Sequence, residues 1–254
     1  MKKSIVFLCA CTLIFSSCRE QTSPPTIADS QTTSLEIQMN YTFDNGTLEF
    51  GEQLFNTGAN MVSFSNIQYY ISGLELRKAD GSWQNIGGHH LVKSTKTGPA
   101  LITFNNIPKG QYDGIRFLIG VDSLSNHADP ALWPNDHPLS VLVGGVMHWS
   151  WNSGYIFIKV EGDYDDVGGA RAGFSYHLGR DDLKVRVEHL GTIINLNSPL
   201  KVGFNFDLKS FFSNPNVLRI VPTTSSTHSS VGDTVATILH QNLQESFSWA
   251  GIIQ

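Results

Sequence analysis

The chain has 254 residues, with 22 acidic and 17 basic side chains and a formal net charge of -5. An acidic chain without a cluster of lysine and arginine residues argues against nucleic acid as a partner. The length fits one large all-β domain as well as two smaller domains.

The first 18 residues, MKKSIVFLCACTLIFSSC, have the pattern of an export signal. Lys2 and Lys3 precede an apolar run over residues 4–15, which is shorter than the roughly 20 residues needed to cross a bilayer. The small residues before Cys18 resemble a bacterial lipobox, which predicts a lipoprotein signal peptide at residues 1–17 and a lipid on Cys18. The alternative is an ordinary signal peptide that is cut nearby.

The three cysteines all lie within residues 1–18, so they leave with the signal or carry the lipid. No thiol then remains for a disulfide, a thiolate metal site or a cysteine nucleophile. Residues 18–33 are polar, contain Pro24-Pro25, and are predicted to form a flexible tether. These features predict a protein anchored by lipid to a membrane of the cell envelope and facing the periplasm, with the outer membrane among the candidates.

From residue 34 onward, short stretches alternate apolar and polar side chains, which is typical of half-buried strands. Turn signals such as Asn45-Gly46 and Asp80-Gly81 separate them. Many short strands with turns between them predict one domain over residues 34–254, an antiparallel β-sandwich of the immunoglobulin-like or Greek-key type. The clearest predicted strands cover residues 35–43, 67–77, 115–121, 155–162, 183–190 and 199–208.

Two segments depart from the strand pattern. Residues 122–146 contain three prolines, which predicts a long irregular insertion. Leu132, Trp133 and Leu139 within it indicate that the insertion packs rather than remaining disordered. Near the C-terminus, apolar residues recur at helical spacing after Asp233, which can cap a helix, so a short helix is predicted over residues 233–248.

The sequence carries no familiar catalytic motif. It has no Walker loop, no Rossmann glycine fingerprint, no HExxH and no GxSxG, so a binding protein is favoured over an enzyme, and a hydrolase with a dispersed site is unsupported. Nine histidines are present without an HxH or HxxxH pair, so a metal site would assemble across the fold. The neighbouring His89 and His90 follow a glycine turn and are expected in an exposed loop.

The segment HWSWNSGY, residues 148–155, places two tryptophans two positions apart. In an extended chain Trp149 and Trp151 point to one face, and His148 points to the other. An intact neutral indole donates a hydrogen bond and does not accept one, so it is a poor metal ligand. Core packing, stacking on a sugar, and a metal site formed after oxidative opening of the indole all stay open at this point.

The stretch GGVMHWSWNSGYIFIKVEG (residues 144–162), followed by FSYHLG (174–179), resembles the MbnP-like periplasmic copper-binding family, which is related to MopE/CorA-type copper proteins. The resemblance extends more loosely over nearly all of the chain after the signal. It implies a non-catalytic protein that binds copper, as Cu(I) or Cu(II), through histidines outside the cytoplasm. In some members a partner dihaem enzyme of the cytochrome c peroxidase type oxidises a tryptophan to kynurenine.

Carried over to this sequence, the resemblance gives His177 of the HLG motif as the first candidate copper ligand, with His148 and His228 as further candidates. Trp149 and Trp151 are the candidates for oxidation. We therefore expect a cell-envelope lipoprotein that stores or delivers copper. The alternative is a surface lipoprotein that binds carbohydrate or protein on an aromatic platform of Trp133, Trp149 and Trp151.

Overall fold

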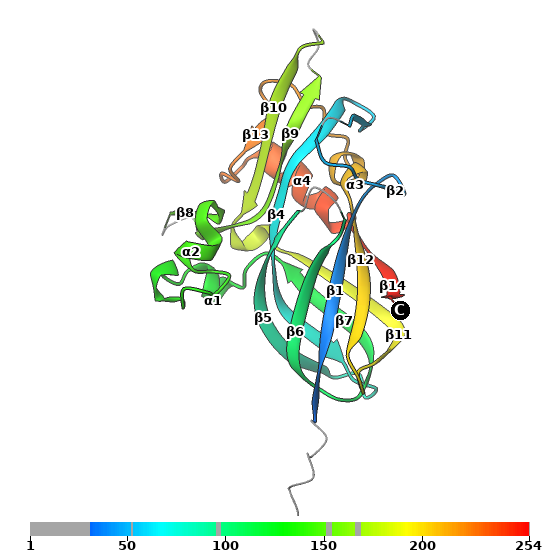
Figure 1. Cartoon of the computed structure of the whole chain (residues 1–254). Helices are drawn as coiled ribbons and strands as arrows, with labels where there is room; N and C mark the ends of the chain where they lie inside the picture. Colours follow the sequence, from blue (N-terminus) through cyan, green and yellow to red (C-terminus); the bar gives the residue numbers. More distant parts are fainter. Residues whose placement is uncertain (1–30, 52, 95–97, 151–153, 166–168, 254) are drawn as a thin grey trace, which may run out of the picture. The chain divides into compact units, whose positions relative to one another are not determined.

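A computed structural model describes residues 31–51, 53–94, 98–150, 154–165 and 169–253 (Figure 1). It confirms an all-β, sandwich-like fold with a short helix near the C-terminus. In the described part of the chain, no helix is long and apolar enough to cross a membrane.

The first sheet has five strands and is built around β1, the first strand of the domain. The order is β14-β12-β1-β2, and β6 pairs with β1 as well. The β1–β12 pair is parallel, so the sheet is mixed rather than purely antiparallel as expected. The strands are β1 Thr32–Phe43, β2 Gly46–Thr47, β6 Ala100–Pro108, β12 Leu200–Asp207 and β14 Phe247–Ile253.

The second sheet has nine strands in the order β11-β7-β4-β9-β10-β13, with β3 and β5 on β4 and β8 on β9. All of its pairs are antiparallel except β10–β13. The strands are β3 Phe55–Asn56, β4 Met61–Arg77, β5 Trp83–Lys93, β7 Gln111–Ile119, β8 His148–Ser150, β9 Gly154–Asp165, β10 Arg171–Gly179, β11 Val185–Asn195 and β13 Ser226–Thr227.

The main core lies between these sheets and follows from the alternation of the strands. Leu35, Ile37 and Met39 of β1 are fully buried, whereas the residues between them are only half-buried. Across the core, the ring of Phe204 on β12 meets Phe117 of β7 at 5.1 Å. Each such side chain contributes about 1.5–3 kcal/mol when it leaves water, so the sheets are held by their apolar faces.

The C-terminal helix α4 spans Thr234–Gln244, and the side chain of Asp233 caps it by accepting from the Ala236 N–H. It ends four residues before the expected limit of 248. Phe247 instead belongs to β14 and stacks on Phe206 with ring centroids 4.6 Å apart. A second short helix, α3, spans Leu208–Ser213.

The irregular insertion lies between β7 and β8 and packs through residues of both its halves, with Asn126 and Leu139 both buried. Leu139 and Met147 are fully buried beside Tyr155, and Trp133 is half-buried against the same cluster. Leu132 was expected to pack but is 80 % exposed. The short helices of the insertion are α1 Ser123–Asn126, η1 Pro130–Leu132, α2 Val141–Gly144 and η2 Gly145–Met147.

Candidate metal centre

The β9–β10 hairpin carries a polar face opposite its core face. Val160 and Tyr176 point inward and are buried. In the antiparallel register Glu161 lies opposite Ser175, and Lys159 lies opposite His177, so these four side chains share the other face. The neighbouring strand β4 places Asn66 directly opposite Glu161.

These side chains form one hydrogen-bonded network centred on the Glu161 carboxylate. The Nε2 atom of His177 is 2.9 Å from Oε1 of Glu161, and Nζ of Lys159 is 3.2 Å from the same oxygen. Asn66 donates to Oε2 at 2.8 Å. Burial would raise the pKa of Glu161, but hydrogen bonds from His177, Asn66 and Lys159 outweigh it and lower that pKa. The carboxylate is therefore ionised and accepts from every neighbour.

The other ring nitrogen of His177 has no hydrogen-bond partner. A carboxylate can only accept, so Nε2 carries the ring proton and Nδ1 keeps its lone pair. Burial, offset in part by Glu161, lowers the pKa of His177 and favours the neutral ring. The Nδ1 atom is nonetheless buried and unpaired. Leaving a buried acceptor unsatisfied costs about 1–3 kcal/mol, so this atom has the features of an unfilled ligand position.

The segment after β13 brings a second imidazole to this point. Strand β13 pairs with Ser175 and Tyr176 of β10. The hydroxyl of Ser229 donates to the His177 carbonyl at 2.9 Å and accepts from the Gly179 N–H at 3.1 Å. These contacts fix the chain so that the His228 ring lies edge-on to the His177 ring, with centroids 5.3 Å apart.

Trp149 of β8 also lies close to His228, with ring centroids 6.1 Å apart. Its indole packs directly over Gly179, where an added Cβ would come within 2.9 Å of the indole Cζ3 atom. The glycine of the HLG motif therefore makes room for this tryptophan. The motif is visible in the sequence, but this role of its glycine is not, because it depends on contact with Trp149, thirty residues earlier.

A cavity of about 340 Å³ connects this group to solvent. Its lining includes Trp149 and His228, together with His127, Arg180 and Asp181. These three ionisable neighbours are already paired, since His127 Nε2 lies 3.1 Å from Asp181 Oδ2 and Arg180 binds Asp182. The Trp149 and His228 side chains are thus the part of the group that an ion from solvent meets first.

Of the remaining candidates from the sequence, the structure describes His148, which lies elsewhere. The His148 ring packs edge-on against Tyr155, with centroids 4.8 Å apart, and lines a different cavity of about 150 Å³. Burial lowers the pKa of His148, although Asp129 acts in the opposite direction. Trp151 and Cys18 lie outside the described residues. The structure thus brings together His177, His228 and Trp149, and it separates His148 from them.

A second histidine cluster forms where His89 of β5 contacts Asp122 and His137 of the insertion. His89 and His90 belong to this strand rather than to an exposed loop, and the His89 side chain is only 16 % exposed. Its Nε2 atom is 2.8 Å from Asp122 Oδ2, and the His137 ring lies 5.5 Å away. Here, however, the Nδ1 atom of His137 accepts the Leu139 N–H at 3.2 Å, so its lone pair is already used.

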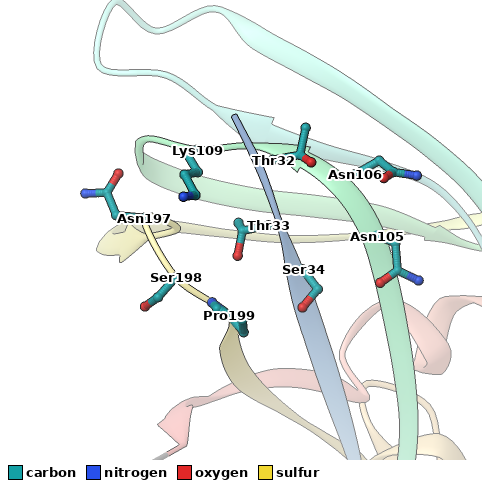
Figure 2. A pocket seen from close by; sticks show the side chains of 9 residues that line it. All are labelled: Thr32, Thr33, Ser34, Asn105, Asn106, Lys109, Asn197, Ser198 and Pro199. Carbon is teal, nitrogen blue, oxygen red and sulfur yellow. The ribbon is translucent and has the colours of Figure 1, made fainter. Parts of the chain in front are cut away.

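A polar hollow of about 440 Å³ lies where β1 begins (Figure 2). Hydroxyl and amide side chains line it, and Lys109 is the one ionisable residue among its nine lining residues. This donor set does not suit a metal ion. Across the described segments, no group of three or more His, Cys, Asp or Glu side chains is arranged to hold one. Of the two histidine pairs described above, the His177–His228 pair is the candidate metal site, because the His177 Nδ1 atom has no partner whereas the His137 Nδ1 atom already accepts a hydrogen bond.

Fold and site together define a class: an all-β protein with a candidate two-histidine metal centre on the polar face of a β-hairpin. A family model described as MbnP matches residues 32–229, and the chain belongs to the MbnP family. The solved structure of MbnP from Methylosinus trichosporium is similar at a TM-score of 0.60 and 14 % identity, covering 89 % of this chain and 100 % of that chain. No functionally curated protein matches the chain. The resemblance seen in the sequence is confirmed at the level of the family and the fold.

Proposed function

We propose that this protein binds one copper ion between His177 and His228, beside Trp149, and stores or delivers copper in the cell envelope. The observation that carries the proposal is the buried Nδ1 atom of His177, which has no hydrogen-bond partner and belongs to a ring that lies edge-on to a second imidazole. Membership of the MbnP family, which is linked to copper and methanobactin, supports the same metal.

The residues present fit a copper ion. Imidazole binds both Cu(I) and Cu(II), and copper has the highest affinity in the divalent series. Two imidazoles that share one ion at about 2 Å each have ring centroids about 5–6 Å apart, and the measured separation is 5.3 Å. All cysteines lie within residues 1–18, so the folded domain offers no thiolate, and the donors of the proposed site are imidazole nitrogens.

An oxidised tryptophan would complete this donor set. Conversion of Trp149 to kynurenine cleaves the indole C2–C3 bond with addition of two oxygen atoms, and hydrolysis then releases formate. This four-electron oxidation would consume two equivalents of hydrogen peroxide, which are reduced to water, and a partner dihaem enzyme of the cytochrome c peroxidase type is proposed to carry it out. The product offers an aniline nitrogen and a ketone beside His228 in place of an indole that cannot accept. Trp151 is the other candidate for this modification.

The proposed location follows from the N-terminal segment. Residues 1–17 would act as a signal peptide, and the lipid on Cys18 would hold the domain at a membrane through a tether that ends near β1. Replacing Cys18→Ser should abolish incorporation of labelled fatty acid and release the protein into the soluble periplasmic fraction. Retention of the label in that variant would contradict the assignment of Cys18.

Copper titration of the mature protein tests the site itself. His177→Ala and His228→Ala should each weaken copper binding by at least about tenfold, because each removes an imidazole ligand. His148→Ala and His89→Ala serve as matched controls and should bind as the unmodified protein does. Equal affinity in all four variants would contradict the proposed site.

Mass analysis of protein purified from its native periplasm tests the modification. A peptide that contains Trp149 should carry the mass change of kynurenine, and Trp149→Phe should remove it. An unmodified Trp149 and Trp151 would leave a site of histidines alone. The platform alternative is less well supported, because Trp133 stacks on His137 at 4.2 Å and Trp149 packs against Gly179.

A further inference from the structure

We infer that Glu161 is a positioning residue for the metal centre: it holds the ring proton of His177 on Nε2 and so presents the Nδ1 lone pair to the ion. The inference rests on the proposed copper site and names the group that selects which nitrogen of His177 serves as the ligand. Neither the family motif nor the strand pattern of the sequence singles out Glu161.

The position of the Glu161 carboxylate is fixed from three strands. Its Oε1 atom receives His177 Nε2 at 2.9 Å, Lys159 Nζ at 3.2 Å and Ser175 Oγ at 3.3 Å. Its Oε2 atom receives Asn66 Nδ2 at 2.8 Å. With both oxygens held and only a quarter of the side chain exposed, the carboxylate is a rigid acceptor rather than a mobile surface charge.

This fixed acceptor decides between the two neutral forms of the imidazole. If the proton were on Nδ1, the Nε2 lone pair would face a carboxylate oxygen at 2.9 Å, which is repulsive. The Ser175 hydroxyl, 3.0 Å from Nε2, could donate to Nε2 in that form, but the repulsion from the carboxylate would persist. With the proton on Nε2, a charge-assisted hydrogen bond forms and Nδ1 is left free for a metal ion. Histidine ligands of metal ions commonly have such a carboxylate partner on the other nitrogen.

The neighbouring Lys159 indicates how Glu161 acts on His177. Glu161 sets the direction of the hydrogen bond to the His177 ring and does not add net negative charge beside it. The Lys159 side chain is only 11 % exposed, and its ammonium group lies at the same Oε1 atom as His177. The lysine and glutamate charges therefore balance each other beside the ring. What remains at His177 is the direction of the hydrogen bond, which determines the ligand atom.

The cluster on β5 provides an internal comparison. Asp122 holds Nε2 of His89 at 2.8 Å in the same way, beside a second histidine and a tryptophan. The lone pair of the second histidine, His137, is already used by the Leu139 N–H. Asp122→Asn is therefore a matched control, since it removes a carboxylate from a histidine without touching the proposed copper site.

Nitrogen-15 NMR of the histidine rings in the metal-free protein is the direct test. His177 should be the Nε2–H form in the unmodified protein. In Glu161→Gln the side-chain amide has the same shape but can offer Nε2 either an oxygen or an NH₂ group, so the Nδ1–H form should appear. Copper affinity should fall about 10–100-fold in Glu161→Gln, while Asp122→Asn keeps the affinity of the unmodified protein. Thermal unfolding of both variants checks that they are folded.

The outcomes separate this inference from the proposed function. An Nδ1–H form of His177 in the unmodified protein overturns the role of Glu161 even where copper binds, and this measurement needs no variant to fold. If His177 is the Nε2–H form but the protein binds no copper, the proposed function is wrong, and so is the role of Glu161 in presenting Nδ1 to a metal ion. Unchanged affinity and ring form in Glu161→Gln overturn the inference alone.

Discussion

Replacing Gly179→Ala tests whether the tryptophan is held beside the paired histidines by close packing on the HLG glycine. A Cβ at this position would lie 2.7 Å from the Tyr155 carbonyl oxygen, 2.9 Å from Trp149 Cζ3 and 3.3 Å from its Cη2 atom. The main chain cannot move away freely, because the Gly179 N–H is bonded to Ser229 Oγ at 3.1 Å. The new methyl group must therefore displace both the indole and strand β9.

The size of the effect follows from these contacts. Inserting one methyl group into a well-packed region costs about 1–3 kcal/mol, and here one of the clashing atoms belongs to the main chain, which favours the upper part of that range. In a domain of this length each kcal/mol lowers the melting temperature by about 2–4 °C, so the expected loss is roughly 2–12 °C. Trp149 should also turn away from His228, so its conversion to kynurenine should decrease.

Urea denaturation and thermal unfolding measure the loss, and a double-mutant cycle with Trp149→Ala assigns it. Removing the indole should relieve part of the penalty, giving a coupling of at least about 0.5 kcal/mol, whereas the clash with the Tyr155 carbonyl persists. Gly173→Ala is the matched control on the same strand. The nearest atom to its added Cβ would be 3.8 Å away, so it should change stability by less than about 0.5 kcal/mol.

Two results would refute this reasoning. If Gly179→Ala unfolds at the same temperature and urea concentration as the unmodified protein, the glycine is not closely packed. If Gly179→Ala loses the same stability with and without the indole, Trp149 does not pack on Gly179, and a contact other than the indole requires glycine at this position.

Two further predictions concern the rest of the domain. Burial, with a smaller contribution from His89, lowers the pKa of His90 to about 4. Between about pH 6.5 and 4 the unfolded state therefore binds a proton at this ring that the folded state does not, so stability should fall as the pH drops through this range. Urea midpoints should fall less steeply over the same range in His90→Gln. Equal slopes would contradict this contribution. Asn126→Ala removes the side-chain oxygen that accepts the buried Tyr155 N–H at 2.8 Å. The loss should lower the free energy of unfolding by about 1–3 kcal/mol and speed limited proteolysis within residues 122–147. Asn197→Ala, at an exposed position, is the control and should change neither quantity. An unchanged cleavage rate in Asn126→Ala would show that the insertion is held by other contacts.

Parts of the candidate site could be read from the sequence, and parts could not. The alternation of HWSW predicts that Trp149 and His148 point to opposite faces, and the structure indeed separates them into different cavities. The HLG motif pointed to His177, but no local pattern pointed to Glu161, which lies sixteen residues earlier and acts through the register of two strands. His89 was expected in a loop because glycines precede it, yet those glycines adopt positive φ angles within strand β5.

The sequence alone indicated six of the strands, the insertion, the absence of thiols after residue 18 and the face on which the residues of those strands lie, because these depend on neighbours along the chain. It did not indicate β5 at His89 or β14 at Phe247, which were expected in a loop and in a helix. The tertiary structure decided which residues meet across strands. Pairing of β10 with β9 and β13 sets Glu161, His177 and His228 together, and a shift of one residue would move His177 to the core face. Such registers are selected by packing between distant segments, and no local pattern records them.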